Sequence, residues 1–145
     1  MGFFLIRSRT VCVATALALA TILHTTEGVA NEAPESDEAK PYVVKIHADW
    51  CGTCKMLEPT WTRIRRELGD EAHVVNLDVS DRAALQRSQA EAERLGISEF
   101  FREYRGSTGI IAVLDGKNHR PIAILRGETD FSKYQEAVAE ASRSS

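Results

Sequence analysis

Cysteine is scarce in this chain, and its scarcity excludes a scaffold held together by many disulfides. Only three cysteines occur among 145 residues, and two of them, Cys51 and Cys54, form a C-x-x-C pair. Small exported domains that depend on disulfides carry several, which close long loops. A bridge across two intervening residues removes little entropy from the unfolded chain. The pair therefore favours a chemical use, with a purely structural bridge as an alternative.

An excess of one charge is also lacking. The chain carries 18 basic and 21 acidic residues, for a formal net charge of −3. Both signs are interspersed after the first thirty residues, so the chain has no basic stripe of the kind that nucleic acid attracts. We therefore expect no nucleic-acid partner. The length and a hydrophobic content of 43% suit one globular domain with an ordinary core.

The apolar run near the N-terminus is too short to span a bilayer. It covers residues 11–23, a length of 13 residues, whereas a spanning helix needs about 20. Two arginines precede it, and small residues at 28–30 suit a signal peptidase. The pattern predicts a signal peptide at residues 1–30, a mature N-terminus at Asn31, and a periplasmic or secreted location. An uncleaved signal, the alternative, would be the only tie to a membrane.

The rest of the chain divides into a leader and a domain. Residues 31–40 are acidic and nearly free of large apolar side chains, which predicts a flexible leader. Residues 41–145 are expected to form the domain, with strands where β-branched residues cluster and helices where apolar residues recur at helical spacing. The expected strands are 42–47, 73–79, 110–114 and 121–125, and the expected helices are 53–68 with a bend at Pro59, 82–95, 97–105 and a last one from about 130.

The order of these segments, β-α-β-α-β-β-α, predicts an α/β fold. A helical crossover makes the first two strands parallel, and the hairpin signal Asp115-Gly116-Lys117-Asn118 makes the last two antiparallel. A mixed sheet with helices on both faces follows.

The position of the cysteine pair indicates thiol chemistry. Cys51 lies at the start of a helix, where unpaired N–H groups and the helix dipole stabilise a thiolate. Cys54 lies one turn further along, where it can displace a partner bound to Cys51. We therefore predict that Cys51 is the nucleophile and Cys54 the resolving thiol. A zinc site, the other use of such a pair, needs two more ligands, and the predicted mature chain offers only His47, His73 and His119.

The segment ADWCGTCKMLEP at residues 48–59 resembles the thioredoxin family, which carries W-C-x-x-C-K and a helix-bending proline at this spacing. The resemblance implies a thioredoxin-like fold in its minimal four-stranded form. It also implies that Trp50 shields the thiols. Gly52 and Thr53, the dipeptide between the cysteines, would contact substrate, and Thr53 would tune the redox potential.

Lys45 is a first departure from the family. It stands where thioredoxins carry a buried acid that accepts the proton of the resolving thiol. Period-two alternation places Lys45 and His47 on one strand face. Either could favour the Cys54 thiolate, or His47 could carry its proton. The alternative is that Lys45 reaches solvent and His47 packs as a neutral ring.

Thr108-Gly109 is a second departure, because it matches the family's Thr-Pro step facing the thiols across the substrate groove. Gly109 cannot supply the proline's lock, so substrate docking at Thr108 and Gly109 is expected to be altered. A glycine there also leaves room for a metal ion beside the thiols. A third departure is the long segment 81–107, whose aromatic residues, Phe100, Phe101 and Tyr104, are either core or a docking patch.

These observations together predict an exported thiol–disulfide oxidoreductase that acts on protein substrates carrying disulfides or thiols, with reduction as the expected direction. It needs an electron donor or acceptor that the sequence does not identify. We expect no cofactor. The alternatives are a metal-binding module resembling a metallochaperone and a non-catalytic adaptor with the same fold.

Overall fold

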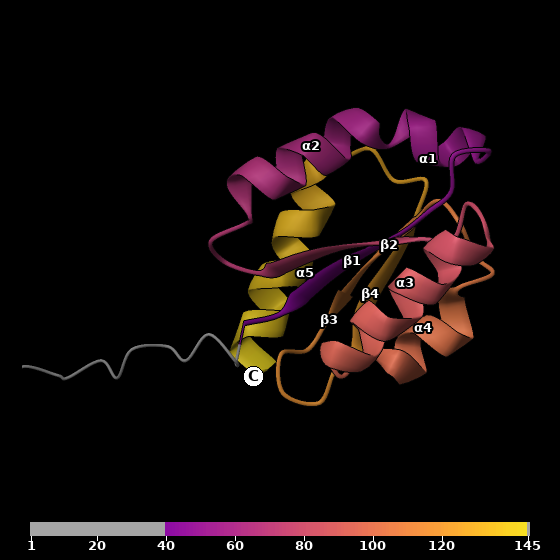
Figure 1. Cartoon of the computed structure of the whole chain (residues 1–145). Coiled ribbons are helices and arrows are strands. Elements are labelled where there is room, and N and C mark those ends of the chain that lie inside the picture. Colours follow the sequence, from indigo (N-terminus) through magenta and orange to yellow (C-terminus); the bar gives the residue numbers. More distant parts are fainter. Residues whose placement is uncertain (1–39, 145) are drawn as a thin grey trace, which may run out of the picture. The chain divides into compact units, whose positions relative to one another are not determined.

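A computed structural model describes residues 40–144, and the predicted signal peptide and residues 31–39 of the predicted leader lie outside that range. The elements are β1 (Tyr42–His47), α1 (Gly52–Met56), α2 (Glu58–Glu67), β2 (His73–Asp78), α3 (Arg82–Arg94), α4 (Ser98–Tyr104), β3 (Ile110–Leu114), β4 (Pro121–Arg126) and α5 (Phe131–Ser144) (Figure 1). Among these helices none is long and apolar enough to cross a membrane.

The four strands form one mixed sheet in the order β2-β1-β3-β4. β1 pairs with β2 in parallel and with β3 antiparallel, and β3 pairs antiparallel with β4. The Asp115 carboxylate holds the β3–β4 hairpin by accepting the N–H groups of Lys117 at 2.8 Å and Asn118 at 2.9 Å. The predicted sheet, with its parallel pair and its antiparallel hairpin, is confirmed.

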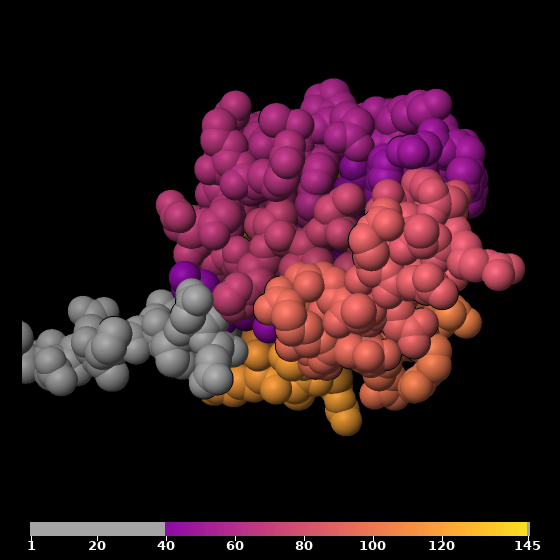
Figure 2. Space-filling view, viewed as in Figure 1, coloured from indigo at the N-terminus to yellow at the C-terminus, as the bar shows by residue number. Residues whose placement is uncertain are grey.

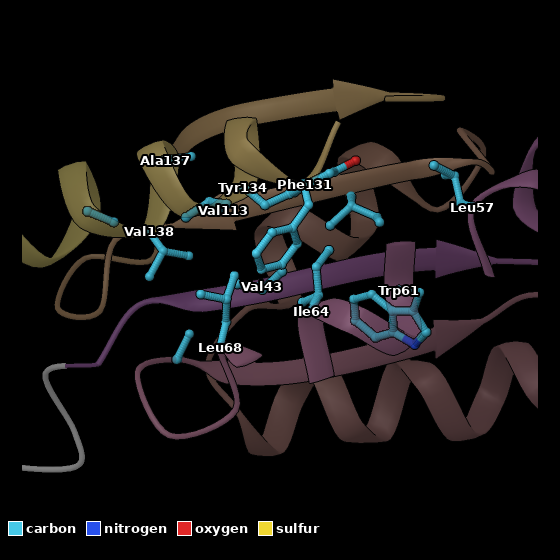
Figure 3. Close-up of a cluster of buried hydrophobic side chains, with 13 residues drawn as sticks. Val43, Leu57, Trp61, Ile64, Leu68, Val113, Phe131, Tyr134, Ala137 and Val138 are labelled. Carbon is cyan, nitrogen blue, oxygen red and sulfur yellow. The ribbon is translucent and has the colours of Figure 1, made fainter. Parts of the chain in front are cut away.

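One face of the sheet is covered by α2 and α5 (Figure 1). The predicted apolar stripe of α2 points into this layer, and Figure 3 shows it meeting the side chains of α5 above β1 and β3. Burial of such large apolar side chains contributes about 1.5–3 kcal/mol each. The residues drawn there include Val43, Leu57, Trp61, Ile64, Leu68, Val113, Phe131, Tyr134, Ala137 and Val138.

The opposite face is covered by α3 and α4, whose side chains form much of the surface in Figure 2. Phe100 and Phe101 are 4% and 2% exposed and pack against this face. Tyr104 stacks on Phe100 with ring centroids 4.9 Å apart. Phe100 and Phe101 are therefore core, and the docking-patch interpretation of these two residues is wrong, whereas Tyr104 is only partly buried against the core.

The helix that carries the cysteines departs from the prediction of one bent helix. It is interrupted at Leu57, which separates α1 from α2, and Pro59 lies in the first turn of α2. Because proline has no N–H and its ring crowds the carbonyl four residues before it, the helix cannot run regularly past Lys55. The Leu57 N–H bonds both Thr53 and Lys55 carbonyls, so the two helices still follow one path.

Candidate functional site

The two cysteines lie where β1 ends and α1 begins. Cys51 is the N-cap residue of α1, with an extended backbone (φ −84°, ψ 110°), and its Sγ accepts the N–H of Cys54 at 3.1 Å. Cys51 is 7% exposed and Cys54 is fully buried. Both are free thiols in this structure. Of the two buried cysteines, only Cys51 keeps a small exposed fraction.

The surroundings of Cys51 favour its thiolate. Burial by itself would raise the pKa of this thiol, but hydrogen bonds from the Cys54 thiol, the Thr108 side chain and the backbone of Cys54 and Thr53 outweigh it, so the pKa is lowered. Hydrogen bonds to the charged form always act in this direction. The predicted substrate residues Thr108 and Thr53 thus both contribute to the electrostatics of Cys51.

Cys54 has the opposite character. Burial raises the pKa of its thiol, and the hydrogen bond and the negative charge of neighbouring Cys51 raise it further, against weaker effects of the Ala48 and Gly109 backbone. The Cys54 Sγ lies 3.8 Å from the carbonyl oxygen of Ile46 on β1. Two thiols three residues apart therefore differ in both exposure and acidity, which is the asymmetry that sequential thiol chemistry needs.

Trp50, predicted to shield the thiols, is fixed at the surface. Its ring is 67% exposed, and its Nε1–H donates to the Ser80 carbonyl at 3.1 Å. The Asp49 N–H also binds this serine, at its Oγ, at 2.9 Å. The loop after β2 therefore anchors the residues before Cys51, and most of the Trp50 side chain stays exposed.

Lys45 and His47 share a strand face as predicted, and they meet a third residue, Glu58. The Lys45 ammonium is 1% exposed and lies 2.5 Å from Glu58 Oε1, so the alternative in which it reaches solvent is wrong. His47 Nε2 lies 3.2 Å from Asp49 Oδ1, and its Nδ1 lies 3.9 Å from Glu58 Oε1. Sequence analysis did not single out Glu58, whose side chain is 49% exposed, and missed this contact. The available signal was a lysine on a buried strand, which needs an acid.

Gly109 meets Thr53 across the site. Its φ is +77°, its N–H donates to Ile46 O at 3.1 Å, and its carbonyl accepts the Gly127 N–H at 3.0 Å. A Cβ at position 109 would lie 2.8 Å from two side-chain atoms of Thr53 and 3.5 Å from Cys51 Sγ. Thr53 therefore fills the space that the glycine leaves, and the expected room for a metal ion is absent. Residues 40–144 hold no group of three or more potential metal ligands.

Comparisons with known proteins agree with this geometry. The family model described as Thioredoxin matches residues 24–99, just over half of the chain. A thioredoxin of Rickettsia typhi is 41% identical over 51 residues, which are 35% of this chain and 47% of that protein. A thioredoxin-like protein of Synechocystis is 26% identical over 96 residues, which are 65% of this chain and 84% of that protein. The chain thus spans about half the length of the first of these relatives.

A solved structure also shares the fold. The secreted thiol–disulfide isomerase of Corynebacterium glutamicum superposes with a TM-score of 0.51 at 18% identity, over 72% of each chain. Members of this fold generally catalyse thiol–disulfide exchange. The predicted fold is confirmed, and the chain belongs to the thioredoxin family.

Proposed function

We propose that this protein is an exported thiol–disulfide oxidoreductase that reduces disulfides of protein substrates through Cys51 and Cys54. The observation that carries the proposal is the asymmetry of the two thiols. Cys51, which is 7% exposed, accepts the Cys54 N–H at its Sγ at 3.1 Å and has a lowered pKa, and the fully buried Cys54 one turn away has a raised pKa. Only a thiolate attacks a disulfide, so the Cys51 sulfur acts first.

The reaction proceeds in two exchanges. The Cys51 thiolate attacks one sulfur of the substrate disulfide, which forms a Cys51–substrate bond and releases the other substrate sulfur as a thiolate. Cys54 then loses its proton and attacks Cys51 Sγ, which forms the Cys51–Cys54 disulfide and releases the second substrate sulfur. The substrate gains two electrons and the protein loses two. An external dithiol donor must reduce the protein before the next cycle.

The surface beside Cys51 suits an extended polypeptide. Trp50 and Met56 are 67% and 53% exposed and offer apolar contacts. Gly109 uses both main-chain groups inside the fold, whereas the Thr108 main chain makes no hydrogen bond to another residue within 40–144. Free main-chain groups beside a nucleophile can pair with a passing strand. Gly52, which is exposed at the start of α1, leaves the approach to the sulfur open.

A lowered pKa of Cys51 predicts fast alkylation near neutral pH. Iodoacetamide should label Cys51 of the reduced protein about tenfold or more faster than it labels glutathione at about pH 7, because a larger fraction of the sulfur is thiolate. The rate should fall as the pH falls through the lowered pKa. Cys54 should stay unlabelled in the same sample, as read by peptide mass spectrometry. A rate equal to that of glutathione would refute the proposed nucleophile.

The exported location rests on residues 1–30 alone. Their charged start, short apolar run and small residues match a signal peptide. In a bacterial host with a periplasm, the protein should therefore accumulate outside the inner membrane with Asn31 as its first residue. Intact-mass spectrometry of the purified protein reads this directly. A mass that includes Met1 would contradict cleavage.

A further inference from the structure

Four charged or titratable side chains form a row of contacts that leads from the buried Lys45 on β1 to solvent. The Lys45 ammonium lies 2.5 Å from Glu58 Oε1 and over the Trp61 ring at 5.5 Å. His47 Nδ1 lies 3.9 Å from the same oxygen, and His47 Nε2 lies 3.2 Å from Asp49 Oδ1. The two ends differ most in exposure, 1% for Lys45 and 83% for Asp49, while Glu58 is 49% and His47 17% exposed.

One ring nitrogen of His47 in this row lacks a hydrogen-bond partner among the described residues. Its Nδ1 is buried and makes no hydrogen bond to any described residue. When the neutral ring donates its Nε2–H to Asp49, Nδ1 carries the lone pair. A buried acceptor without a donor is costly unless a donor arrives during function. Among the described residues, the carboxyl group of Glu58, once protonated, is such a donor.

Glu58 and Cys54 face the same short stretch of β1. Cys54 Sγ is 3.8 Å from the carbonyl oxygen of Ile46, and the Glu58 carboxylate contacts Lys45 and His47, the residues on either side. The two residues are also four apart in the sequence, one on each side of the break at Leu57, whose N–H still bonds Thr53 O at 3.1 Å. Side chains at that spacing lie on the same side of a helical turn.

Cys54 needs a proton acceptor to do its part. Its thiol is buried and must become a thiolate before it can attack Cys51. Glu58 is half exposed and borders a hollow of about 300 Å³, which Lys45, His47, Arg65 and Asn76 also line. These are the charged and polar groups that face it from β1, α2 and β2. A proton that reaches this carboxylate therefore has a route to solvent.

We propose that Glu58 accepts the proton of Cys54 in the second exchange, with His47 and Asp49 as positioning residues. This inference rests on the proposed function. The S–H bond of Cys54 breaks, the proton goes to the Glu58 carboxylate, and the sulfur keeps the electron pair with which it attacks Cys51 Sγ. Protonated Glu58 then donates to His47 Nδ1 or to water in the hollow. Lys45 holds the carboxylate against β1 between cycles.

Glu58→Gln tests this with a chromogenic aromatic disulfide, dithiobis-nitrobenzoate. Attack by Cys51 releases one coloured thiolate, and displacement by Cys54 releases the second, so stopped-flow absorbance separates the two exchanges. We expect the second phase of Glu58→Gln to be at least about tenfold slower than wild type at about pH 6, and the first phase to stay within about twofold. Glu58→Asp should recover much of the second phase, and the deficit should shrink as pH rises.

The direction in which Glu58→Gln changes the rate of the second phase separates proton transfer from a simple charge effect. Loss of a negative charge near Cys54 would favour its thiolate and speed the second phase, so an unchanged or faster second phase overturns the proposal. Glu67→Gln, on the same helix and paired with Arg63, is the matched control and should behave as wild type. Release of fewer than two coloured thiolates per wild-type molecule would instead refute the proposed function.

A second variant tests whether Glu58→Gln acts by disturbing the fold. Glu58→Gln leaves the Lys45 ammonium buried without its counter-ion, and Lys45→Met/Glu58→Gln removes both charges. If Glu58→Gln slows both phases together, the double variant decides. A slow second phase with a normal first phase in the double variant supports the proposal, and two normal phases overturn it.

Discussion

Cys51→Ser should lower the rate of insulin disulfide reduction, driven by dithiothreitol, by at least about a thousandfold. A serine hydroxyl is not ionised at neutral pH, and Cys54 cannot replace it because that thiol is fully buried and has a raised pKa. Turbidity from the precipitating insulin chain measures the rate. Because the side chains differ by one atom, far-ultraviolet circular dichroism and the melting temperature should remain close to those of wild type.

Cys54→Ser should fail in a different way. Cys51 keeps a donor to its sulfur, the residue-54 N–H, so the first exchange still occurs and a mixed disulfide with the substrate accumulates. Non-reducing electrophoresis should show this adduct, and reductant should remove it. Cys51→Ser/Cys54→Ser is the control and should form none. If that double variant retained full function in the cell, the adaptor interpretation would replace catalysis.

The regular parts of this fold follow from local patterns. The stripe Leu57, Trp61, Ile64 and Leu68 predicted one buried helix face, and all four side chains are buried. The hairpin residues 115–118 predicted the antiparallel pair of β3 and β4, which the structure contains. Such features depend on spacing and turn chemistry within a few residues, and sequence records both directly.

The contacts that shape the site depend on tertiary structure, and sequence records them poorly. Glu58 has the pattern of a solvent-facing helix residue, yet it pairs with Lys45, thirteen positions earlier on a strand. From the sequence, the aromatic residues of α4 could be either core or a docking patch. Only their packing against the sheet shows that Phe100 and Phe101 belong to the core. Family resemblance predicted where the thiols lie, and it did not predict how Lys45 and Gly109 are accommodated.

Gly109→Ala should destabilise the protein by about 2–5 kcal/mol. A left-handed backbone costs an L-residue about 1–2 kcal/mol, and φ at this position is +77°. The new Cβ would also lie 2.8 Å from Thr53 side-chain atoms, and overpacking of this kind costs about 1–3 kcal/mol. Thermal unfolding should show the melting temperature falling by about 10–20 °C. Gly106→Ala, whose Cβ would meet nothing within 4 Å, should change stability by less than about 1 kcal/mol.

A double-mutant cycle with Thr53→Gly separates the two costs at Gly109. Removing the threonine side chain relieves the contact and leaves the backbone penalty, so the cycle should return a coupling of about 1–3 kcal/mol. No coupling would mean that Thr53 does not occupy the space above Gly109. Proline, the residue that thioredoxins carry here, would fit worse than alanine, because it fixes φ near −65° and lacks the N–H that binds Ile46 O at 3.1 Å. Thr53 and Gly109 therefore form a matched pair. A larger residue at position 109 requires a smaller one at position 53.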